Sequence, residues 1–218
     1  MIRLLAIAGS PVKEGNVEAL LLEALRVASA DPEVQTEIFN LSGLEIAGCR
    51  HCNWCLKRQT PEKFCSLSDG MDSIYPAMVK ADALILATPV HIGRMSGMMA
   101  NMMDRMRVFV YGKVHRAGLK DKVGGALVVG FLRHGGLEMT LSVLNSSFAL
   151  FNMISVGPGG LVLSSLEGKG KVTKGIRHMA LEDSFGLASA KEVIQRAVEL
   201  ARIIRAGKKA LRVNAKNA

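Results

Sequence analysis

The sequence from residue 2 to residue 29 reads IRLLAIAGSPVKEGNVEALLLEALRVAS. It opens on a continuous apolar run, residues 2–9, that ends in a glycine, which is typical of a strand buried on both faces of a sheet. A polar loop follows, and residues 17–29 then carry apolar side chains at helical spacing, with Asn16 placed to cap the helix. A buried strand, a short glycine-containing loop and an amphipathic helix form the first unit of an α/β fold.

The same alternation of strands and helices continues along the chain. We expect four more strands, at residues 34–41, 83–90, 123–130 and 153–157. We expect further helices at residues 71–81, where Pro76 interrupts the helix, at 97–108, at 137–151, and at 189–211 within a C-terminal helical region of residues 185–213. Residues 158–184 contain many Gly, Lys and Ser and are expected to form a loop. The pattern predicts a single domain over residues 1–218, with a doubly wound five-stranded parallel sheet and helices on both faces.

The composition is that of a globular protein with a large core. Of the 218 residues, 49% are hydrophobic and 22% are charged, and no apolar run reaches the roughly 18 residues of a membrane span. The N-terminus lacks the polar spacer and small-residue cleavage site of a signal peptide. We therefore expect a cytoplasmic protein without membrane contact, in which clustered thiols serve as metal ligands or redox groups rather than disulfides.

The net charge of +9 is unevenly distributed along the chain. From residue 191 to the end, eight Lys and Arg residues stand against two Glu residues, a net charge of +6. One interpretation is a solvated helix face; another is a docking surface for an acidic partner or an anionic cofactor. Nucleic acid is the weaker option, because the basic segment has no interleaved aromatic residues and no known binding motif.

The four cysteines of the chain lie together in one segment, residues 49–65, with the sequence CRHCNWCLKRQTPEKFC. The spacing is C-x2-C-x2-C-x9-C, and the segment belongs to a loop, 48–66, inserted after the second strand. Three thiols at every third position can converge on one point, and a fourth can close the shell if the stretch containing Pro61 folds back. This spacing favours a [4Fe–4S] cluster over zinc, which more often uses two separate C-x2-C pairs. Bare redox thiols remain a third interpretation.

Three predicted strands end in loops suited to a ligand. The first loop, residues 9–17, offers Ser10, Lys13 and Asn16 as donors next to a helix N-terminus, which is a site for a phosphate group. It matches neither the P-loop nor the G-x-G-x-x-G motif. The second and third loops are residues 88–96 and 130–136. Because ligands bind at the carboxyl ends of strands in open α/β sheets, the three loops together can surround one flat, phosphorylated ligand.

The loop sequences GSPVKEGNVEALL, TPVHIGRMSGMMANMMDR and GFLRHGGLEMTL resemble those of the flavodoxin-like NAD(P)H-dependent FMN reductase family. The cysteine segment after the second strand resembles the iron–sulfur flavoprotein branch of that family. The ending LEDSFGLASAKEVIQRAVELA is similar to the family's last helix. The resemblance covers residues 1–157 and this closing helix, and it implies that the chain binds FMN and a [4Fe–4S] cluster.

The resemblance also implies which residues bind each cofactor. No side chain is implied as catalytic, because the cofactors carry the chemistry. The implied phosphate loop, ring contacts and closing loop comprise Ser10, Lys13, Gly15, Asn16, Val17, Pro89, Val90, His91, Ile92, Gly93, Gly130, Arg133, Gly135 and Gly136. The implied ligands of the cluster are Cys49, Cys52, Cys55 and Cys65.

The function that follows from the resemblance is electron transfer between the cluster and FMN, from a ferredoxin-type donor to a two-electron acceptor. The family implies a homodimer or homotetramer, with the cluster and FMN approaching each other across a subunit interface, and an acidic electron carrier such as ferredoxin as partner. One alternative is an NAD(P)H-dependent FMN or quinone reductase without a cluster. Another is a zinc-stapled binding module.

The stretch MSGMMANMMDRM, residues 95–106, contains half of the twelve methionines of the chain. Their spacing covers one wide face of the helix expected at residues 97–108, and thioethers pack adaptably. We therefore expect a core contact or a dimer seam there rather than contact with the flavin. Asp104 and Arg105, at the end of this stretch, match the family and are expected to brace the helix rather than to catalyse.

Overall fold

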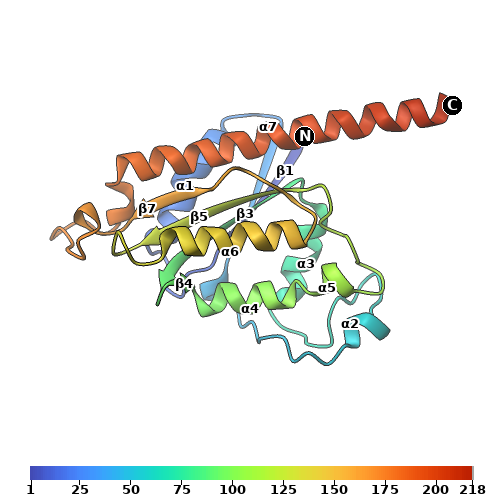
Figure 1. Cartoon of the computed structure of the whole chain (residues 1–218), viewed down its shortest axis with the longest axis horizontal. Helices are drawn as coiled ribbons and strands as arrows, with labels where there is room; N and C mark the ends of the chain where they lie inside the picture. The colour runs from blue at the N-terminus through green and yellow to red at the C-terminus, as the bar shows by residue number, and fades with distance from the viewer. Residues whose placement is uncertain (218) are drawn as a thin grey trace.

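A computed structural model describes residues 1–217, with side chains described for residues 1–211. Its centre is a parallel sheet with the strand order β2-β1-β3-β5, followed by β6 and β7, which both pair with β5 (Figure 1). The parallel strands are β1 (Ile2–Ala8), β2 (Val34–Asn40), β3 (Ala83–His91), β5 (Val123–Gly130), β6 (Ile154–Ser155) and β7 (Gly160–Leu163). This is the flavodoxin-like order of a doubly wound fold, and it confirms the predicted architecture.

The fifth position of the sheet differs in detail from the sequence prediction. The strand expected at residues 153–157 is only the two-residue β6, and β7 lies inside the stretch 158–184 that was expected to be loop. Gly157 and Gly159 both have positive φ, 52° and 107°, and turn the backbone out of the sheet between the two short strands. The chain then returns beside β5, where Leu127 pairs with Gly160.

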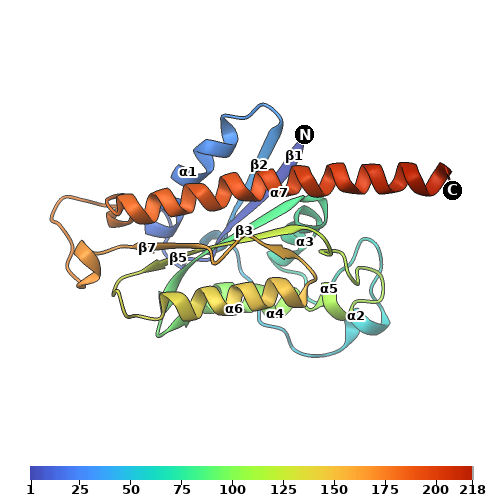
Figure 2. The same ribbon diagram turned by 45° about the horizontal axis from the view of Figure 1, so that its top comes forward.

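Helices cover both faces of the sheet, as Figures 1 and 2 show. One face is packed by α1 and α7, and the other by α3, α4 and α6, each over its own hydrophobic cluster. The helices are α1 (Asn16–Ser29), α2 (Trp54–Lys57), α3 (Met71–Lys80), α4 (Gly97–Arg105), α5 (Val108–Tyr111), α6 (Leu137–Leu150) and α7 (Ser184–Asn217). Three 3₁₀ turns, Leu41–Gly43, Leu166–Gly168 and Met179–Leu181, complete the fold, and a two-residue strand, β4 (Arg94–Met95), pairs with β3 as a hairpin.

Two expectations about helix ends and breaks are wrong. Asn16 does not cap α1: the N-cap is Gly15, and the Asn16 side chain instead accepts a hydrogen bond from the N–H of Ala180, at 2.8 Å. Pro76 does not interrupt α3, which is continuous from Met71 to Lys80. The proline only removes the donor for the carbonyl of Asp72, and Asp72 lies on the exposed side of the helix, where water can satisfy that carbonyl.

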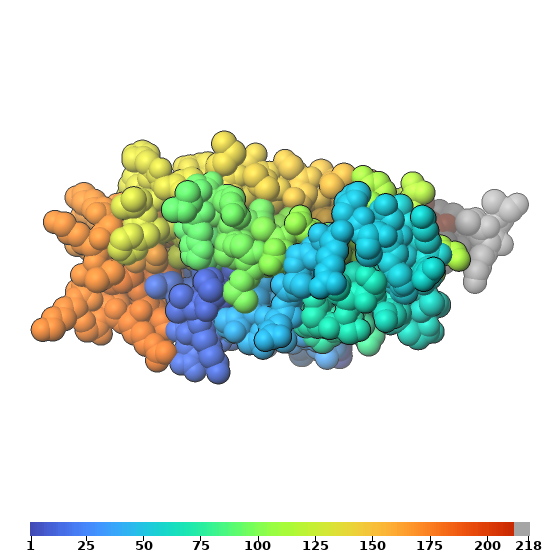
Figure 3. Space-filling view, turned by 90° about the horizontal axis from the view of Figure 1, so that it is seen from below, coloured from blue at the N-terminus to red at the C-terminus, as the bar shows by residue number. Residues whose placement is uncertain are grey.

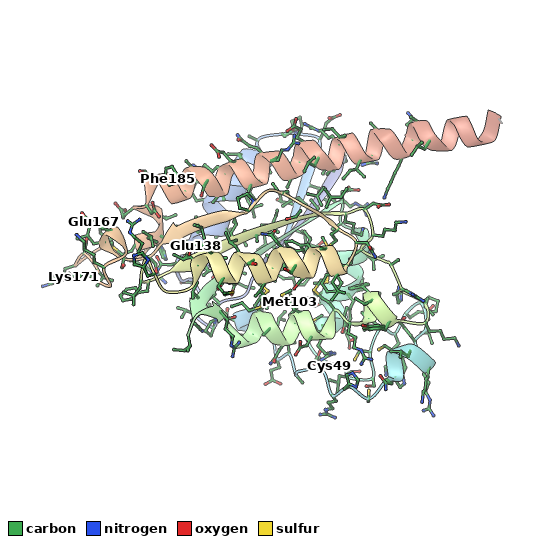
Figure 4. The ribbon with its side chains drawn as sticks, in the orientation of Figure 1. Cys49, Met103, Glu138, Glu167, Lys171 and Phe185 are labelled. Atoms are coloured by element: carbon green, nitrogen blue, oxygen red, sulfur yellow. The ribbon has the colours of Figure 1, made fainter. Side chains whose placement is uncertain are left out.

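The methionines of α4 and its flanks belong mainly to the core. Met99, Met102 and Met106 are fully buried in the cluster beneath the sheet. Met98 and Met103 are only partly buried, and Met103 lies near α6 (Figure 4). The expectation of a core contact is therefore confirmed for one face of the helix.

The basic helix α7 is longer than expected, since it begins at Ser184 and continues through residue 217. Its first half packs on the sheet, and its second half extends past the body of the molecule (Figure 1). Several of its cations pair with acids of the body: Lys191 with Glu23, Arg202 with Asp31, and Lys208 with Asp121. These pairs support the solvated-face interpretation; the side chains of Arg212 and Lys216 lie outside the described residues. Within the described part of the chain, no helix has both the length and the apolar character to cross a membrane.

Candidate functional site

A cavity of about 390 Å³ opens at the carboxyl ends of β1, β3 and β5. Its size lies within the usual range for small-molecule sites. Eight of the residues expected to bind FMN line it together with six others: Ser10, Val12, Lys13, Glu14, Gly15, Asn16, Val17, Pro89, Val90, His91, Val129, Phe131, Ser164 and Arg177. The first two strand-end loops therefore meet at one site, as the sequence predicted.

The loop after β1 forms one wall of this cavity. Ser10 is buried, and its hydroxyl accepts a hydrogen bond from the N–H of Val12 at 3.1 Å. Gly15 is held close to Val12, since a Cβ at position 15 would lie 2.9 Å from a Val12 methyl carbon. The helix α1 begins directly after it, so its first N–H groups, at Asn16 and Val17, have no partner within the helix. Together with the positive end of the helix dipole, these donors form a site for a phosphate group.

A second segment clamps this loop from the outside. The carboxylate of Glu14 pairs with Arg177 at 2.8 Å, and the Glu14 carbonyl lies 3.0 Å from the ring Nε2 of His178. The N–H of Glu14 donates to the carboxylate of Glu18 at 2.6 Å. Arg177 thereby places a cation at the edge of the cavity. It lies in the stretch of residues 158–184 that was expected to be loop. The one sequence feature that could have indicated its role is the pair of basic residues at 177–178.

The opposite wall is the hairpin of β3 and β4, in which Val90 pairs with Met95 and His91 with Arg94. Pro89, Val90 and His91 line the cavity. The turn at Ile92 and Gly93 requires positive φ at both residues, 48° and 74°. Two-residue turns of this kind favour Asn-Gly, so a β-branched residue at the first position is unusual. The side chain of Ile92 is fully exposed.

Six of the residues implied by the resemblance do not line the cavity: Ile92, Gly93, Gly130, Arg133, Gly135 and Gly136. Three of the four glycines have close neighbours: a Cβ at Gly130 would meet Leu137 at 2.8 Å, one at Gly135 the Leu132 carbonyl at 3.0 Å, and one at Gly136 the Cα of Gly93 at 2.7 Å. Arg133 donates to the carbonyl of Glu167 at 3.2 Å. The third loop thus supports the walls of the cavity, and contact of these six residues with FMN stays a prediction.

Val12, Glu14, Val129, Phe131, Ser164 and Arg177 line the cavity but were not expected there. Ser164 directly follows β7. Its N–H and its hydroxyl both donate hydrogen bonds to the carbonyl of Gly130, at 2.8 and 3.2 Å. Phe131 is partly exposed beside it. Ser164 and Arg177 were missed because they follow β7, a strand that the sequence did not reveal.

All four cysteines line a second, much smaller hollow. Its cavity volume is about 20 Å³, and its lining is completed by Arg50, Asn53, Ser66, Leu67, Arg105, Arg107 and Val108. The cysteines are present as free thiols. Within the described residues, no three Cys, His, Asp or Glu side chains converge closely enough to hold a single metal ion. Four thiols that line one hollow are a donor set used by both iron–sulfur clusters and zinc ions.

The long gap between Cys55 and Cys65 is folded back by a buried clamp. Gln59 is buried; its carbonyl oxygen accepts from the N–H groups of Val114 and His115, both at 2.9 Å, and its amide donates to the Phe64 carbonyl at 3.1 Å. The Phe64 ring stacks between Tyr75 and His115, with centroids 5.0 and 3.8 Å away. Since Phe64 immediately precedes Cys65, this anchor delivers the fourth cysteine to the other three.

Two cysteines of the hollow differ in how strongly their surroundings favour the thiolate. Hydrogen bonds from Ser66 and from the N–H of Trp54 hold the pKa of Cys52 below its usual value. Burial raises the pKa of Cys55, and the positive charge of Arg107 opposes that rise. The N–H of His51 points to the sulfur of Cys49 at 3.4 Å. Donors and cations of this kind stabilise anionic sulfur ligands.

Arg105 braces the cysteine loop from inside, as the sequence analysis expected of a structural residue. It is fully buried and makes two hydrogen bonds to the carboxylate of Asp69, at 2.6 and 3.2 Å, and one to the carbonyl of Ala47, at 2.9 Å. Asp69 in turn accepts from the N–H groups of Ala47 and Met71. Arg105 therefore ties the start of the loop at Ala47 to the start of α3.

The two hollows share no lining residue. The helix α4 runs from the hairpin at one end to the cysteine loop at the other (Figure 1). Figure 4 shows Cys49 below α4 and Glu138 near the start of α6. A larger cavity of about 770 Å³ lies between α7 and the opposite edge of the sheet. Two of the six cations that line it, Arg202 and Lys208, pair with acidic residues, and the cavity is remote from the carboxyl edge where ligands bind in this fold.

Comparison with known proteins identifies the family. The model of the family "NADPH-dependent FMN reductase" matches residues 2–167. An iron–sulfur flavoprotein of Methanocaldococcus jannaschii is 33% identical over 93% of this chain and 99% of its own length. An NAD(P)H dehydrogenase (quinone) of Afipia carboxidovorans is 40% identical over 66% of this chain and 65% of its own.

Among solved structures, RosB with a bound riboflavin-phosphate intermediate is similar in fold, with a TM-score of 0.74 at 13% identity. The similarity covers 100% of this chain and 88% of RosB. The cavity at the carboxyl edge, the cysteine segment and these matches agree with one another. The chain belongs to the NADPH-dependent FMN reductase family, in its iron–sulfur flavoprotein branch, and is an FMN-dependent oxidoreductase.

Proposed function

We propose that this protein transfers electrons between a [4Fe–4S] cluster, held by Cys49, Cys52, Cys55 and Cys65, and FMN, held in the cavity at the carboxyl edge of the sheet. The donor is a ferredoxin-type carrier, and the acceptor takes two electrons. When bound, the cluster supplies one-electron transfer and FMN links it to two-electron chemistry.

The observation that carries this proposal is the shared hollow of the four cysteines. Three of them follow at every third position, but Cys65 reaches the hollow only because Gln59 and Phe64 fold the intervening chain back. If the contacts of Gln59 and Phe64 served only to fix the loop, they would not need to place the thiol of Cys65 beside three others. The donor set, four thiols in a hollow also lined by three arginines, suits an anionic cluster.

The cavity at the carboxyl edge fits FMN by its own chemistry. The N–H groups at the start of α1, Ser10 and Lys13 provide donors and a cation for the phosphate. Pro89, Val90 and Val129 provide apolar walls, which suit the flat faces of a flavin ring. The carboxylate of Glu14 would repel a phosphate, but Arg177 pairs with it and offsets its charge.

The protein contributes orientation and charge to this reaction. Arg107 places positive charge beside the cysteines, and its guanidinium is fixed by a hydrogen bond to Asn53 at 2.9 Å. The hydroxyl of Ser66, 3.3 Å from the sulfur of Cys52, is positioned to donate to that sulfur when it is a thiolate. Both groups favour an electron-rich centre, so removing either is expected to change its reduction potential.

The test is purification without oxygen, followed by a visible spectrum and by assays for iron, sulfide and flavin in the full-length protein. We expect FMN together with about four irons and four sulfides per chain. Bound flavin with neither iron nor sulfide would refute the cluster, and one zinc per chain would replace it with a structural metal site.

A second candidate function is an NAD(P)H-dependent FMN or quinone reductase in which the cysteines are structural. It is favoured by the separation of the two hollows, which lets the flavin end work without the cysteine end, and by the similarity to a quinone-reducing dehydrogenase. A Cys65→Ser variant without iron that still oxidises NAD(P)H at the wild-type rate would select this function. A binding module without enzymatic activity, the remaining alternative, does not agree with membership of a reductase family.

We also propose that the protein works as a homodimer or homotetramer. Within one chain, the cysteine hollow and the FMN cavity share no lining residue. In this proposal, electrons pass from the cluster of one chain to the FMN of another. Which face joins the chains is a separate question.

A further inference from the structure

The cavity of about 770 Å³ under the second half of α7 lies at the amino ends of β1, β2, β3 and β5. Its volume lies within the usual range for small-molecule sites, and it shares no lining residue with the FMN cavity or the cysteine hollow. Figure 3 shows the loop after β1 and the cysteine loop on the face seen from below, whereas α7 runs along the top of Figure 1. Neither redox site therefore accounts for this cavity.

The lining of this cavity is basic. Its cations are Lys120, Lys122, Arg202, Arg205, Lys208 and Lys209. Its acids are Glu33, Asp82 and Asp121. Six positive charges therefore stand against three negative ones, a net charge of +3. A concave surface with charge of one sign in excess raises the local concentration of ions of the opposite sign, here anions.

Ion pairs neutralise only part of this positive charge. Arg202 pairs with Asp31 and Glu33, at 2.7 and 3.3 Å, and Lys208 pairs with Asp121 at 3.3 Å. Among the residues that the structure describes, the other four cations of the cavity have no carboxylate as a salt-bridge partner. These four charges are available to an anionic ligand.

The cations of α7 continue the stripe by which this helix packs on the sheet. Ile194, Ala197 and Ala201 are buried and lie three and four positions apart. Arg205 and Lys208 follow four and three positions further on and therefore lie on the same side of the helix. A helix that carries charges only for contact with water has them on its outer face, whereas these two cations line the cavity. A solvated helix face does not explain their position.

Lys122 lies on the sheet side of the cavity and is held in place. It directly precedes β5, and its ammonium group donates hydrogen bonds to the carbonyl of Val79, at 2.8 Å, and to that of Ala81, at the end of α3. Burial lowers the pKa of Lys122; the charge of Asp82 opposes this effect, and that of Lys208 adds to it. An anion bound in the cavity would stabilise the charged form of Lys122.

The chemistry of the lining indicates the class of ligand. Ammonium and guanidinium groups bind phosphate oxygens through charge-assisted hydrogen bonds. A net charge of +3 matches a ligand with two or three phosphate groups better than a single phosphate or carboxylate. Because the cations line a cavity between α7 and the strand ends, they fit a small ligand better than a long polyanion such as nucleic acid, which follows an outer surface.

We infer that the cavity at the amino edge of the sheet binds a small ligand with two or more phosphate groups. Lys120 and Lys122 hold this ligand from the sheet side. Arg205 and Lys209 hold it from α7. The ligand is additional to FMN, whose phosphate site is at the start of α1, and the inference does not depend on electron transfer between the cluster and FMN.

The test is isothermal titration calorimetry of tripolyphosphate into the full-length protein at physiological ionic strength, with FMN bound so that the phosphate site at α1 is occupied. We expect the wild type to bind with a dissociation constant of about 10–100 µM. Inorganic phosphate should bind at least about tenfold more weakly, because it meets fewer of the cations.

The variant Lys120→Gln/Lys209→Gln removes two exposed cations of the cavity and should weaken the binding of tripolyphosphate roughly tenfold or more. Its control is Arg26→Gln/Arg196→Gln, which removes the same charge at exposed positions of α1 and α7 outside the cavity. The control should weaken binding by less than about twofold, since charges remote from the ligand are screened by salt.

Circular dichroism shows whether each variant is folded, and Arg205→Gln gives a second measurement, with binding weakened roughly threefold or more. A wild-type dissociation constant above about 1 mM, or equal losses in the cavity variant and its control, would overturn the inference. So would inorganic phosphate that binds as tightly as tripolyphosphate, or a polyglutamate peptide that binds more tightly, because the cavity would then serve a single anion or an acidic protein chain.

Discussion

The FMN cavity and the cysteine hollow are built in different ways. The cavity is formed by loops at the ends of parallel strands, so the sheet itself brings Ser10, Pro89 and Val129 together. The hollow is formed by an insertion with almost no regular structure. Two buried side chains hold it in place: Arg105, from the end of α4, and Gln59, within the insertion, which binds the backbone at Val114 and His115. One site follows from the fold, and the other depends on a few specific contacts. Substitutions in those contacts should therefore affect the two ends of the molecule unequally.

The largest effect is expected from Arg105→Ala. The change removes a fully buried guanidinium and leaves the partly buried Asp69 carboxylate without its charged partner, which costs about 3–5 kcal/mol of unfolding free energy. Urea denaturation of the variant and the wild type measures this loss. Arg196→Ala, which removes an exposed pair with Glu199, is the control and should cost about 0.5 kcal/mol or less. A loss below about 1 kcal/mol for R105A would contradict the role of Arg105 as the brace of the loop.

Gln59→Ala is expected to separate the two sites most clearly. It leaves the N–H groups of Val114 and His115 without their acceptor, at a cost of about 1–3 kcal/mol, and it frees the chain that delivers Cys65. Iron per chain should fall while FMN binding, followed by flavin fluorescence, stays at the wild-type level. Gln195→Ala, at an exposed position of α7, should change neither. Equal losses of iron and FMN in Q59A would show that the two ends are not independent.

Asp69 gives the cysteine end a dependence on pH. Burial raises the pKa of this carboxyl, but hydrogen bonds from Arg105 and from the N–H groups of Met71 and Ala47 outweigh it, and the pKa ends below its usual value. A lowered pKa means that the stabilisation is complete above about pH 4 and is lost as the pH falls through the folded-state value. The difference in stability between wild type and Asp69→Asn should therefore shrink below about pH 4. A stability difference between wild type and Asp69→Asn that stays constant from neutral to acidic pH would show that Asp69 is not the group with the lowered pKa.

The smallest effect is expected at the FMN end from Arg177→Ala. The pair of Arg177 with Glu14 is exposed, so its loss should cost less than about 1 kcal/mol of stability. FMN affinity should fall by roughly three- to tenfold, since Glu14 then repels the phosphate without compensation. Titration of FMN against the apoprotein measures this, with Arg177→Lys as the variant that retains the charge. An unchanged FMN affinity of R177A would show that Arg177 has no role in FMN binding.

The contrast between the two sites also explains what the sequence could predict. Strands such as residues 2–9 and 123–130 end in glycines and precede amphipathic helices, so the sheet order and the loops at its edge were predictable. β7 was missed because its four residues lie between glycines and a Lys- and Ser-containing stretch, and Ser164 and Arg177 were missed with it. The spacing of the cysteines indicated a shared site, but nothing local to them shows that Gln59 meets Val114 and His115, because that contact joins positions 55 and 56 residues apart.

The central claim is that one chain carries two redox centres, and an anaerobic reductive titration tests it most directly. With FMN accepting two electrons and the cluster one, the wild type should take up about three electrons per chain. The Cys65→Ser variant, loaded with FMN, should take up about two, with the flavin absorbance bleaching as in the wild type. Uptake of two electrons by both proteins would contradict the account, because it would leave the four cysteines without a redox centre.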